Sequence, residues 1–371
     1  MSANHAARRV ALATMLQAQQ LSALLVTDLV NVRYLTGFTG SNAALLVWAE
    51  PGRAPVFSTD GRYVEQAAEQ VPDLVAEISR DALAPLLTAA ENCAAANSAA
   101  VDVGPVGFEA TQLSVAVHAD IRRRAPGLAL QATTGLVEGL RIVKDEHEVG
   151  LLRRACAIAD EALAILLERE GIRPGRTERQ VARDLEWLMY EGGADGIGFE
   201  TIVAAGANSA VPHHRPTSAV LAEGDLVKLD FGAQYGGYHS DMTRTFTLGS
   251  CAQWQRDTYD LVASAQQAGL DAVVPGALAA DVDAAARSVI AAAGVGELFA
   301  HGLGHGVGLQ IHEAPGIGSS ATGTLPCGAA VTVEPGVYHA RRGGVRIEDT
   351  VIVREGGPEI LTVTTKELLV L

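Results

Sequence analysis

Two hairpin-like segments in the last third of the chain, each carrying a pair of acidic residues, constrain the fold more than any other feature. The first segment covers residues 226–248 and carries Asp230 and Asp241. With a turn at Tyr235 and Gly236, the two acidic residues lie directly opposite each other on one face. Cross-strand neighbours of this kind have Cβ atoms about 4.5–5.5 Å apart. Carboxylates at that separation repel each other unless a cation lies between them, so the pattern predicts a metal site.

The second hairpin-like segment repeats this arrangement with two glutamates. A turn about Arg341 places Glu334 opposite Glu348. Between the two hairpins lies His305, whose flanking glycines permit close approach of the backbone. Four carboxylates and one imidazole suit Mn²⁺, Co²⁺ or Zn²⁺ in a centre with two ions about 3.5–4 Å apart. Each residue taken singly is more often a turn or surface residue, so the prediction depends on their combination.

The first third of the chain alternates short strands and helices, which predicts a small α/β domain. Strands are expected at Ala23–Val26, Ala43–Trp48 and residues 54–57, and helices at residues 8–20, 60–70 and 85–100. Near residue 140 the character changes, because the charge-dense residues 144–148 open an amphipathic helix. We therefore predict one domain at residues 1–140 and a second at residues 141–371.

The second domain is expected to combine helices with hairpins. Thr177 can cap a helix, and Gln180 three positions later completes a capping box. Gly192 and Gly193 end that helix. The last third is rich in glycine and β-branched residues and contains the two acidic hairpins. This mixture predicts an α+β fold.

Composition limits the partners and the cellular setting. The 371 residues include 28 Lys and Arg against 43 Asp and Glu, a formal net charge of −15. Such a balance argues against binding of nucleic acid and against docking on an anionic membrane. The four cysteines are far apart in the sequence and are expected to be reduced thiols. We recognise no secretory signal and no apolar run of about 18 residues, so a cytoplasmic location is expected.

Several motifs together resemble one family of metallopeptidases. The segments KLDFGAQYGGYHSDMTRTF, HGLGHGVGLQIHEAP, TVEPGVY and GGVRIEDT are similar to those of Xaa-Pro dipeptidases (prolidases), aminopeptidase P and methionine aminopeptidase. The upstream segments NVRYLTGFTGSNAALLV and STDGRY resemble the creatinase-like N-terminal domain of the proline-specific branch. The resemblance implies a C-terminal pita-bread fold, preceded by a smaller creatinase-like α/β domain.

The resemblance also implies a role for each predicted metal ligand. Asp230 resembles a ligand of one metal only, and Asp241 and Glu348 resemble carboxylates that bridge both metals. His305 and Glu334 resemble ligands of the other metal. We therefore expect two divalent ions per chain, with Mn²⁺ favoured and Co²⁺ or Zn²⁺ as alternatives.

The implied mechanism is attack of a metal-bridging hydroxide on the carbonyl carbon before proline. Glu334 is the candidate proton shuttle. His213 and His312 match family histidines that donate hydrogen bonds to the developing oxyanion. Arg346 resembles the arginine that braces the ligands or contacts substrate, and His301 matches a further site histidine.

Two ambiguities concern these histidines. His214 competes with the adjacent His213 for the same role, although the motif favours His213. Each of the histidines can alternatively be a structural residue whose ring nitrogens are satisfied by hydrogen bonds.

The sequence therefore predicts a metallopeptidase that hydrolyses Xaa-Pro bonds in short proline-containing peptides. An Xaa-Pro dipeptidase is favoured over aminopeptidase P because the chain carries no extra domain, and a homodimer is expected. Two alternatives stay open. One is a metallohydrolase of the same fold whose specificity has drifted away from proline, and the other is a non-catalytic binding protein of pita-bread fold.

Overall fold

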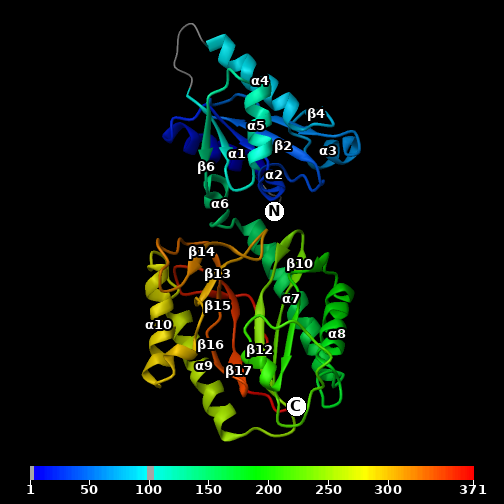
Figure 1. Cartoon of the computed structure of the whole chain (residues 1–371), viewed down its shortest axis with the longest axis vertical. Helices are drawn as coiled ribbons and strands as arrows, with labels where there is room; N and C mark the ends of the chain where they lie inside the picture. Colours follow the sequence, from blue (N-terminus) through cyan, green and yellow to red (C-terminus); the bar gives the residue numbers. More distant parts are fainter. Residues whose placement is uncertain (1–3, 98–103) are drawn as a thin grey trace. The chain divides into compact units, whose positions relative to one another are not determined.

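The computed structural model describes residues 4–97 and 104–371. The chain divides into two compact units, Met1–Arg141 and Ile142–Leu371 (Figure 1). Each unit has its own sheets and helices, and each is described separately below.

The first unit is built on one six-stranded sheet with strand order β4-β3-β2-β1-β5-β6. Its strands are β1 (Ala23–Val26), β2 (Ala43–Trp48), β3 (Val56–Thr59), β4 (Ala76–Ile78), β5 (Val106–Glu109) and β6 (Leu130–Thr133). Its helices are α1 (His5–Ala18), α2 (Leu29–Thr36), α3 (Val64–Gln70), α4 (Leu83–Asn97), α5 (Val115–Arg124) and α6 (Leu136–Arg141). Every residue of β1 and β2 is buried, as expected for strands covered on both faces. The predicted α/β character of this unit is confirmed.

Several predicted boundaries in this unit need adjustment. The strand expected at residues 54–57 lies at Val56–Thr59, and the helix expected from residue 60 begins at Val64. The helix expected at residues 85–100 is α4, and its last predicted positions, 98–100, lie outside the described residues.

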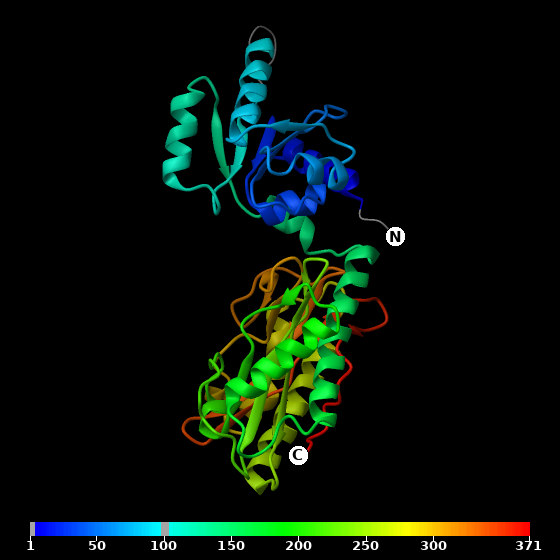
Figure 2. The same ribbon diagram turned by 90° about the vertical axis from the view of Figure 1, so that its right-hand side faces the viewer.

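The second unit contains four α-helices among its described residues, namely α7 (Glu146–Glu168), α8 (Glu178–Glu191), α9 (Gln253–Ala272) and α10 (Ala279–Ala292). The predicted capping box starts α8, because Gln180 donates its backbone N–H to the Thr177 hydroxyl and accepts from the Thr177 N–H. In Figure 1 the strands of this unit lie between α9 and α10 on one side and α7 and α8 on the other. Figure 2 shows the unit from the side, with α8 (green) in front of the strands.

The strands of this unit are antiparallel throughout the described pairings. They are β7 (Gly196–Ile197), β8 (Ile202–Ala205), β9 (Leu226–Phe231), β10 (Ala233–Tyr235), β11 (Tyr238–His239), β12 (Met242–Thr247), β13 (Gly304–Gly306), β14 (Glu313–Ile317), β15 (Ala330–Val333), β16 (Gly336–His339), β17 (Gly343–Arg346), β18 (Asp349–Ile352) and β19 (Glu359–Ile360). Two 3₁₀ turns, Gly206–Ala210 and Gly296–Leu298, complete the unit. The predicted α+β class and pita-bread fold are confirmed.

Two apolar cores hold these strands from opposite sides. In one core, Ile158 of α7 and Leu185 of α8 pack with Leu229 of β9. In the other, Val262 of α9 and Val282 of α10 pack with strands β15 to β18. The two carboxylate-bearing ribbons are therefore fixed by helices packed against them.

The register of the first ribbon differs from the prediction. Asp230 pairs with Thr243, so the expectation that it lies directly opposite Asp241 is wrong. The turn is at Gly236 and Gly237, whose φ values of 56° and 81° fit a two-residue type I′ turn. Moving the turn by one residue shifts the register by two, which leaves both acidic side chains on the same face.

The register of the second ribbon is confirmed. The pairing of β15 with β18, in which Val333 lies opposite Asp349, continues in register through β16 and β17. Glu334 and Glu348 are therefore opposite each other, at the point where both strands are interrupted.

Among the described residues, the structure has no helix long and apolar enough to cross a membrane.

The positive φ of Gly237 yields a test of the corrected turn. We expect Gly237→Ala to lower the free energy of unfolding by about 1 kcal/mol, because a Cβ disfavours the left-handed region. Gly356→Ala is the matched control, since a Cβ there meets no atom within 4 Å and needs no positive φ. Urea unfolding of both variants measures the difference, and equal stabilities would contradict the revised turn.

Candidate metal centre

All five predicted metal ligands line a single pocket of the second unit, with a volume of about 280 Å³. They come from separate segments: Asp230 lies in β9 and His305 in β13, while Asp241 directly precedes β12, Glu334 directly follows β15 and Glu348 directly precedes β18. The remaining lining residues are Phe199, Glu200, Ile202, His213, His214, Arg215, Ile311 and His312. This volume lies just below the range of about 300–1,000 Å³ that is typical of small-molecule sites.

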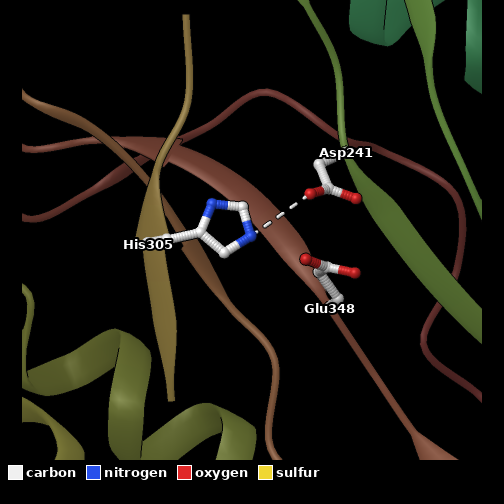
Figure 3. A group of neighbouring side chains, drawn as sticks. All are labelled: Asp241, His305 and Glu348. Carbon is white, nitrogen blue, oxygen red and sulfur yellow. Dashed lines mark ion pairs between the residues drawn. The ribbon is translucent and has the colours of Figure 1, made fainter. Parts of the chain in front are cut away.

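Three of these ligands are close enough to share one ion. Asp241, His305 and Glu348 each offer one ligand atom within 4.8 Å of the others, and Figure 3 shows their side chains pointing toward one another. Glu334 adjoins this group, because its Oε1 lies 3.4 Å from His305 Nε2. Asp241 Oδ2 lies 3.5 Å from the same nitrogen. Three of the four predicted carboxylate ligands therefore converge on one imidazole.

Hydrogen bonding prepares the His305 ring to bind a metal. Its Nδ1 lies 3.0 Å from the Gly306 carbonyl oxygen, which fits a proton on Nδ1 and leaves the Nε2 lone pair facing the carboxylates. Burial lowers the pKa of His305 to about 4, so the ring is neutral near pH 7. A neutral imidazole with its free nitrogen toward three carboxylates is a competent metal ligand.

The glycines beside His305 are required by packing. A Cβ on Gly304 would collide with the Thr332 carbonyl oxygen, and one on Gly306 would collide with the Ala314 carbonyl oxygen. Because β13 lies between β14 and β15, only glycines allow the histidine to reach the carboxylates.

Asp230 has one satisfied oxygen and one unsatisfied oxygen. Its Oδ2 forms an ion pair with Arg346, while its Oδ1 is buried and has no hydrogen-bond partner among the described residues. An orphaned buried carboxylate oxygen is costly in a protein interior. A divalent cation would satisfy this atom, so the residues present fit a metal here.

The protein groups around these carboxylates supply too little positive charge to neutralise them. Burial, followed by the neighbouring carboxylates, raises the pKa of both Asp241 and Glu348 well above the usual range. Burial likewise raises the pKa of Glu334 to about 7. The Thr243 hydroxyl donates to Glu348 at 2.7 Å, and Arg346 is the one guanidinium to pair with the group in the described part of the chain. Such a cluster binds extra protons unless divalent ions replace them.

Arg346 lies behind the ligands and does not line the pocket. Its guanidinium donates to the Thr243 hydroxyl at 2.9 Å, to the Tyr338 hydroxyl at 2.9 Å and to the Pro212 carbonyl at 3.2 Å. Although burial opposes its charge, Tyr338 and the carboxylates raise its pKa well above the usual value. Its geometry fits the bracing role rather than contact with substrate.

The predicted histidines separate into two groups. His213 and His312 line the pocket, and the rings of His312 and His305 are 4.4 Å apart. His301 does not line it, because its Nε2 bonds the Tyr338 hydroxyl at 2.8 Å. His214 also lines the pocket, but its Nε2 is bonded at 2.8 Å to the buried Glu178. His213 and His312 therefore share the pocket with the ligands, whereas His301 lies outside its lining.

Sequence reasoning missed a buried lysine that holds the segment before His213. Lys228 Nζ donates to the Val211 carbonyl at 2.7 Å and to the Pro212 carbonyl at 3.2 Å. Its side chain is fully buried on β9. The signal was present, because Lys228 is two residues before Asp230 and therefore shares its face of the strand.

Comparison with known proteins identifies the family. Residues 8–143 match the creatinase/prolidase N-terminal domain, and residues 150–355 match metallopeptidase family M24. The chain belongs to metallopeptidase family M24. The predicted family resemblance and the predicted enzyme class, a metallopeptidase, are thereby confirmed.

Relatives of this M24 chain include proteins named for action on Xaa-Pro substrates. An Xaa-Pro dipeptidase from Pyrococcus furiosus is 40% identical over 264 residues, which is 71% of this chain and 75% of the relative. The structure of an Xaa-Pro dipeptidase from Bacillus anthracis matches with a TM-score of 0.91 and 36% identity, covering 99% of this chain and 100% of the other. An X-Pro aminopeptidase from Thermotoga maritima matches with a TM-score of 0.85 and 30% identity over 95% and 98% of the two chains.

The raised carboxyl pKa values make metal binding and stability depend on pH. Glu334 titrates at about 7 in the folded protein, against a usual value of 4.5. Without metal, this difference stabilises the fold at low pH, and the contribution is lost as the pH rises from 4.5 through about 7. Because divalent ions replace the protons, we expect Mn²⁺ to raise the Tm more at about pH 8 than at about pH 5.

Thermal unfolding of metal-free and Mn²⁺-supplemented protein measures this difference. Glu334→Gln cannot ionise at this position and should show a weaker pH dependence of the Mn²⁺ effect. An increase in Tm of the same size at both pH values in the unaltered protein would contradict the account.

Proposed function

We propose that this chain is a dinuclear metal-dependent peptidase that hydrolyses Xaa-Pro bonds in short peptides. The observation that carries the proposal is the convergence of four carboxylates, three of them buried, and His305 in one pocket, with Asp230 Oδ1 left unsatisfied. The names of the relatives support the substrate class. We assign peptide hydrolysis to residues 141–371 and the creatinase-like domain to residues 1–140.

The pocket residues suggest how two ions would be held. Asp230 would bind one ion only, and Asp241 and Glu348 would bridge both ions. His305 and Glu334, 3.4 Å apart, would hold the other ion. The oxygen-rich set suits Mn²⁺, with Co²⁺ or Zn²⁺ as alternatives. Bound ions of this kind lower the pKa of water so that a hydroxide nucleophile is available near neutral pH.

The chain's own residues supply proton transfer and orientation. Glu334 lines the pocket beside His305 and can accept a proton from the attacking water and return it to the leaving amine. His213 and His312 line the pocket and can donate hydrogen bonds to the oxygen of the scissile carbonyl. Phe199, Ile202 and Ile311 give the pocket an apolar wall against which a proline ring can pack.

The proposed assembly and setting extend beyond the site. A homodimer, a cytoplasmic location and the absence of nucleic-acid or membrane partners stay predictions from the sequence.

A peptide panel tests the substrate class: Ala-Pro, Ala-Pro-Ala, Met-Ala-Ser and Ala-Ala, each with and without Mn²⁺. Turnover of the Xaa-Pro peptides alone would support the proposal. Turnover of Ala-Ala would favour drifted specificity, and a protein without metal or activity would favour a binding function.

The bridging role of Asp241 leads to a direct test. We expect Asp241→Ala to reduce Ala-Pro hydrolysis by more than about 100-fold and to weaken the binding of both ions, because the residue would contact both. Elemental analysis of the purified protein gives the metal content. Asp257→Ala is the matched control, since Asp257 is exposed on α9. Normal activity and metal content in Asp241→Ala would refute the bridging role.

Lys228 is expected to act through His213. Lys228→Met removes the hydrogen bonds to the two carbonyls that precede His213, so we expect kcat to fall about 10–100-fold with the metal content unchanged. In a double-mutant cycle, adding His213→Ala should cause little further loss, because both changes impair the same contact. Losses that multiply in the double variant would show that Lys228 does not position His213.

A further inference from the structure

An exposed ion pair forms part of the lining of this pocket. Arg215 Nε is 3.0 Å from Glu200 Oε2. Both residues line the same pocket as the ligands. The Arg215 side chain is 82% exposed and that of Glu200 is 61% exposed. The pair is therefore accessible to a molecule that enters from solvent.

Arg215 is distinctive because of the charges around it. Of the residues lining this pocket in the described part of the chain, it is the one with a permanent positive charge. The other lining cations are imidazoles, which carry charge only when protonated, and His214 is already bonded to Glu178. Arg346 is buried behind the ligands.

The proposed substrates differ in where they carry negative charge. In an Xaa-Pro dipeptide the free carboxylate is on the proline itself, next to the bond that is cleaved. In a longer peptide the same position is a neutral amide. With the ligand carboxylates neutralised by metal, Glu200 is the lining carboxylate that repels an entering substrate carboxylate, and a cation beside it offsets that repulsion.

Arg215 can change partners at little cost. Exposed ion pairs contribute only about 0–1 kcal/mol, so Glu200 holds the guanidinium near the pocket without immobilising it. A guanidinium can bind a carboxylate through two parallel hydrogen bonds, which makes it selective for a free carboxylate over an amide.

We propose that Arg215 binds the C-terminal carboxylate of an Xaa-Pro dipeptide and that Glu200 competes with the substrate for it. This inference rests on the proposed peptidase function and assigns dipeptides, rather than longer peptides, as the preferred substrates. Arg215 is thus a specificity-determining residue, and the ion pair sets how strongly the enzyme distinguishes a carboxylate from an amide.

The test compares Ala-Pro with Ala-Pro-amide, which differ only in the terminal charge, on the Mn²⁺-loaded full-length protein. We expect Arg215→Gln to raise the KM for Ala-Pro about tenfold, the size of one lost charge-assisted hydrogen bond, with little change in kcat. The KM for Ala-Pro-amide should not change. Glu200→Gln should lower the KM for Ala-Pro about two- to fivefold by releasing Arg215.

Arg183→Gln is the matched control, since Arg183 is an exposed arginine of α8 that does not line this pocket. It should leave both KM values unchanged. Equal KM changes for the acid and the amide in Arg215→Gln, or no change for either, would overturn the inference while leaving the proposed peptidase intact. If the unaltered protein cleaved none of Ala-Pro, Ala-Pro-Ala and Ala-Pro-amide, the proposed function would be overturned and the inference with it.

Discussion

The mutual repulsion of four clustered carboxylates, three of them buried, is the interaction on which the rest of the second unit depends. Burial alone raises the pKa of Asp241, Glu334 and Glu348, and each neighbouring carboxylate raises it further. Asp230 adds a buried oxygen without a hydrogen-bond partner among the described residues. Divalent cations relieve both the repulsion and the unsatisfied oxygen. The same concentration of negative charge that disfavours the metal-free fold therefore gives the site its affinity for metal.

The surrounding structure prevents the carboxylates from moving apart. Apolar cores on opposite sides fix the strands, so the acidic side chains cannot reach solvent by a small shift of one ribbon. Arg346 and Thr243 hold individual oxygens, and the glycines beside His305 allow its strand to lie close to β15. Lys228 extends this network to the segment that presents His213. The ligands are thus held by buried contacts, whereas His213, His312 and Arg215 of the pocket lining are exposed.

Sequence patterns predicted the ligand cluster because periodicity in a strand assigns side chains to faces. For the second ribbon, the predicted turn about Arg341 was enough to place Glu334 opposite Glu348. The first ribbon was displaced by two residues because two glycines, Gly236 and Gly237, form the turn, yet both acidic residues kept their face. The hydrogen bond of His301 to Tyr338 could not be predicted, since it joins residues 37 positions apart through side-chain geometry. The helices α9 and α10 were also not predicted, and the apolar core against strands β15 to β18 depends on them.

Anomalous X-ray scattering from crystals grown with Mn²⁺ tests the central claim most directly. We expect two peaks about 3.5–4 Å apart, one against Asp230 and the other against His305 and Glu334, with Asp241 and Glu348 between them. Anomalous peaks elsewhere, or crystals that contain Mn²⁺ but in which Asp230 contacts only Arg346, would contradict a dinuclear site built from these residues.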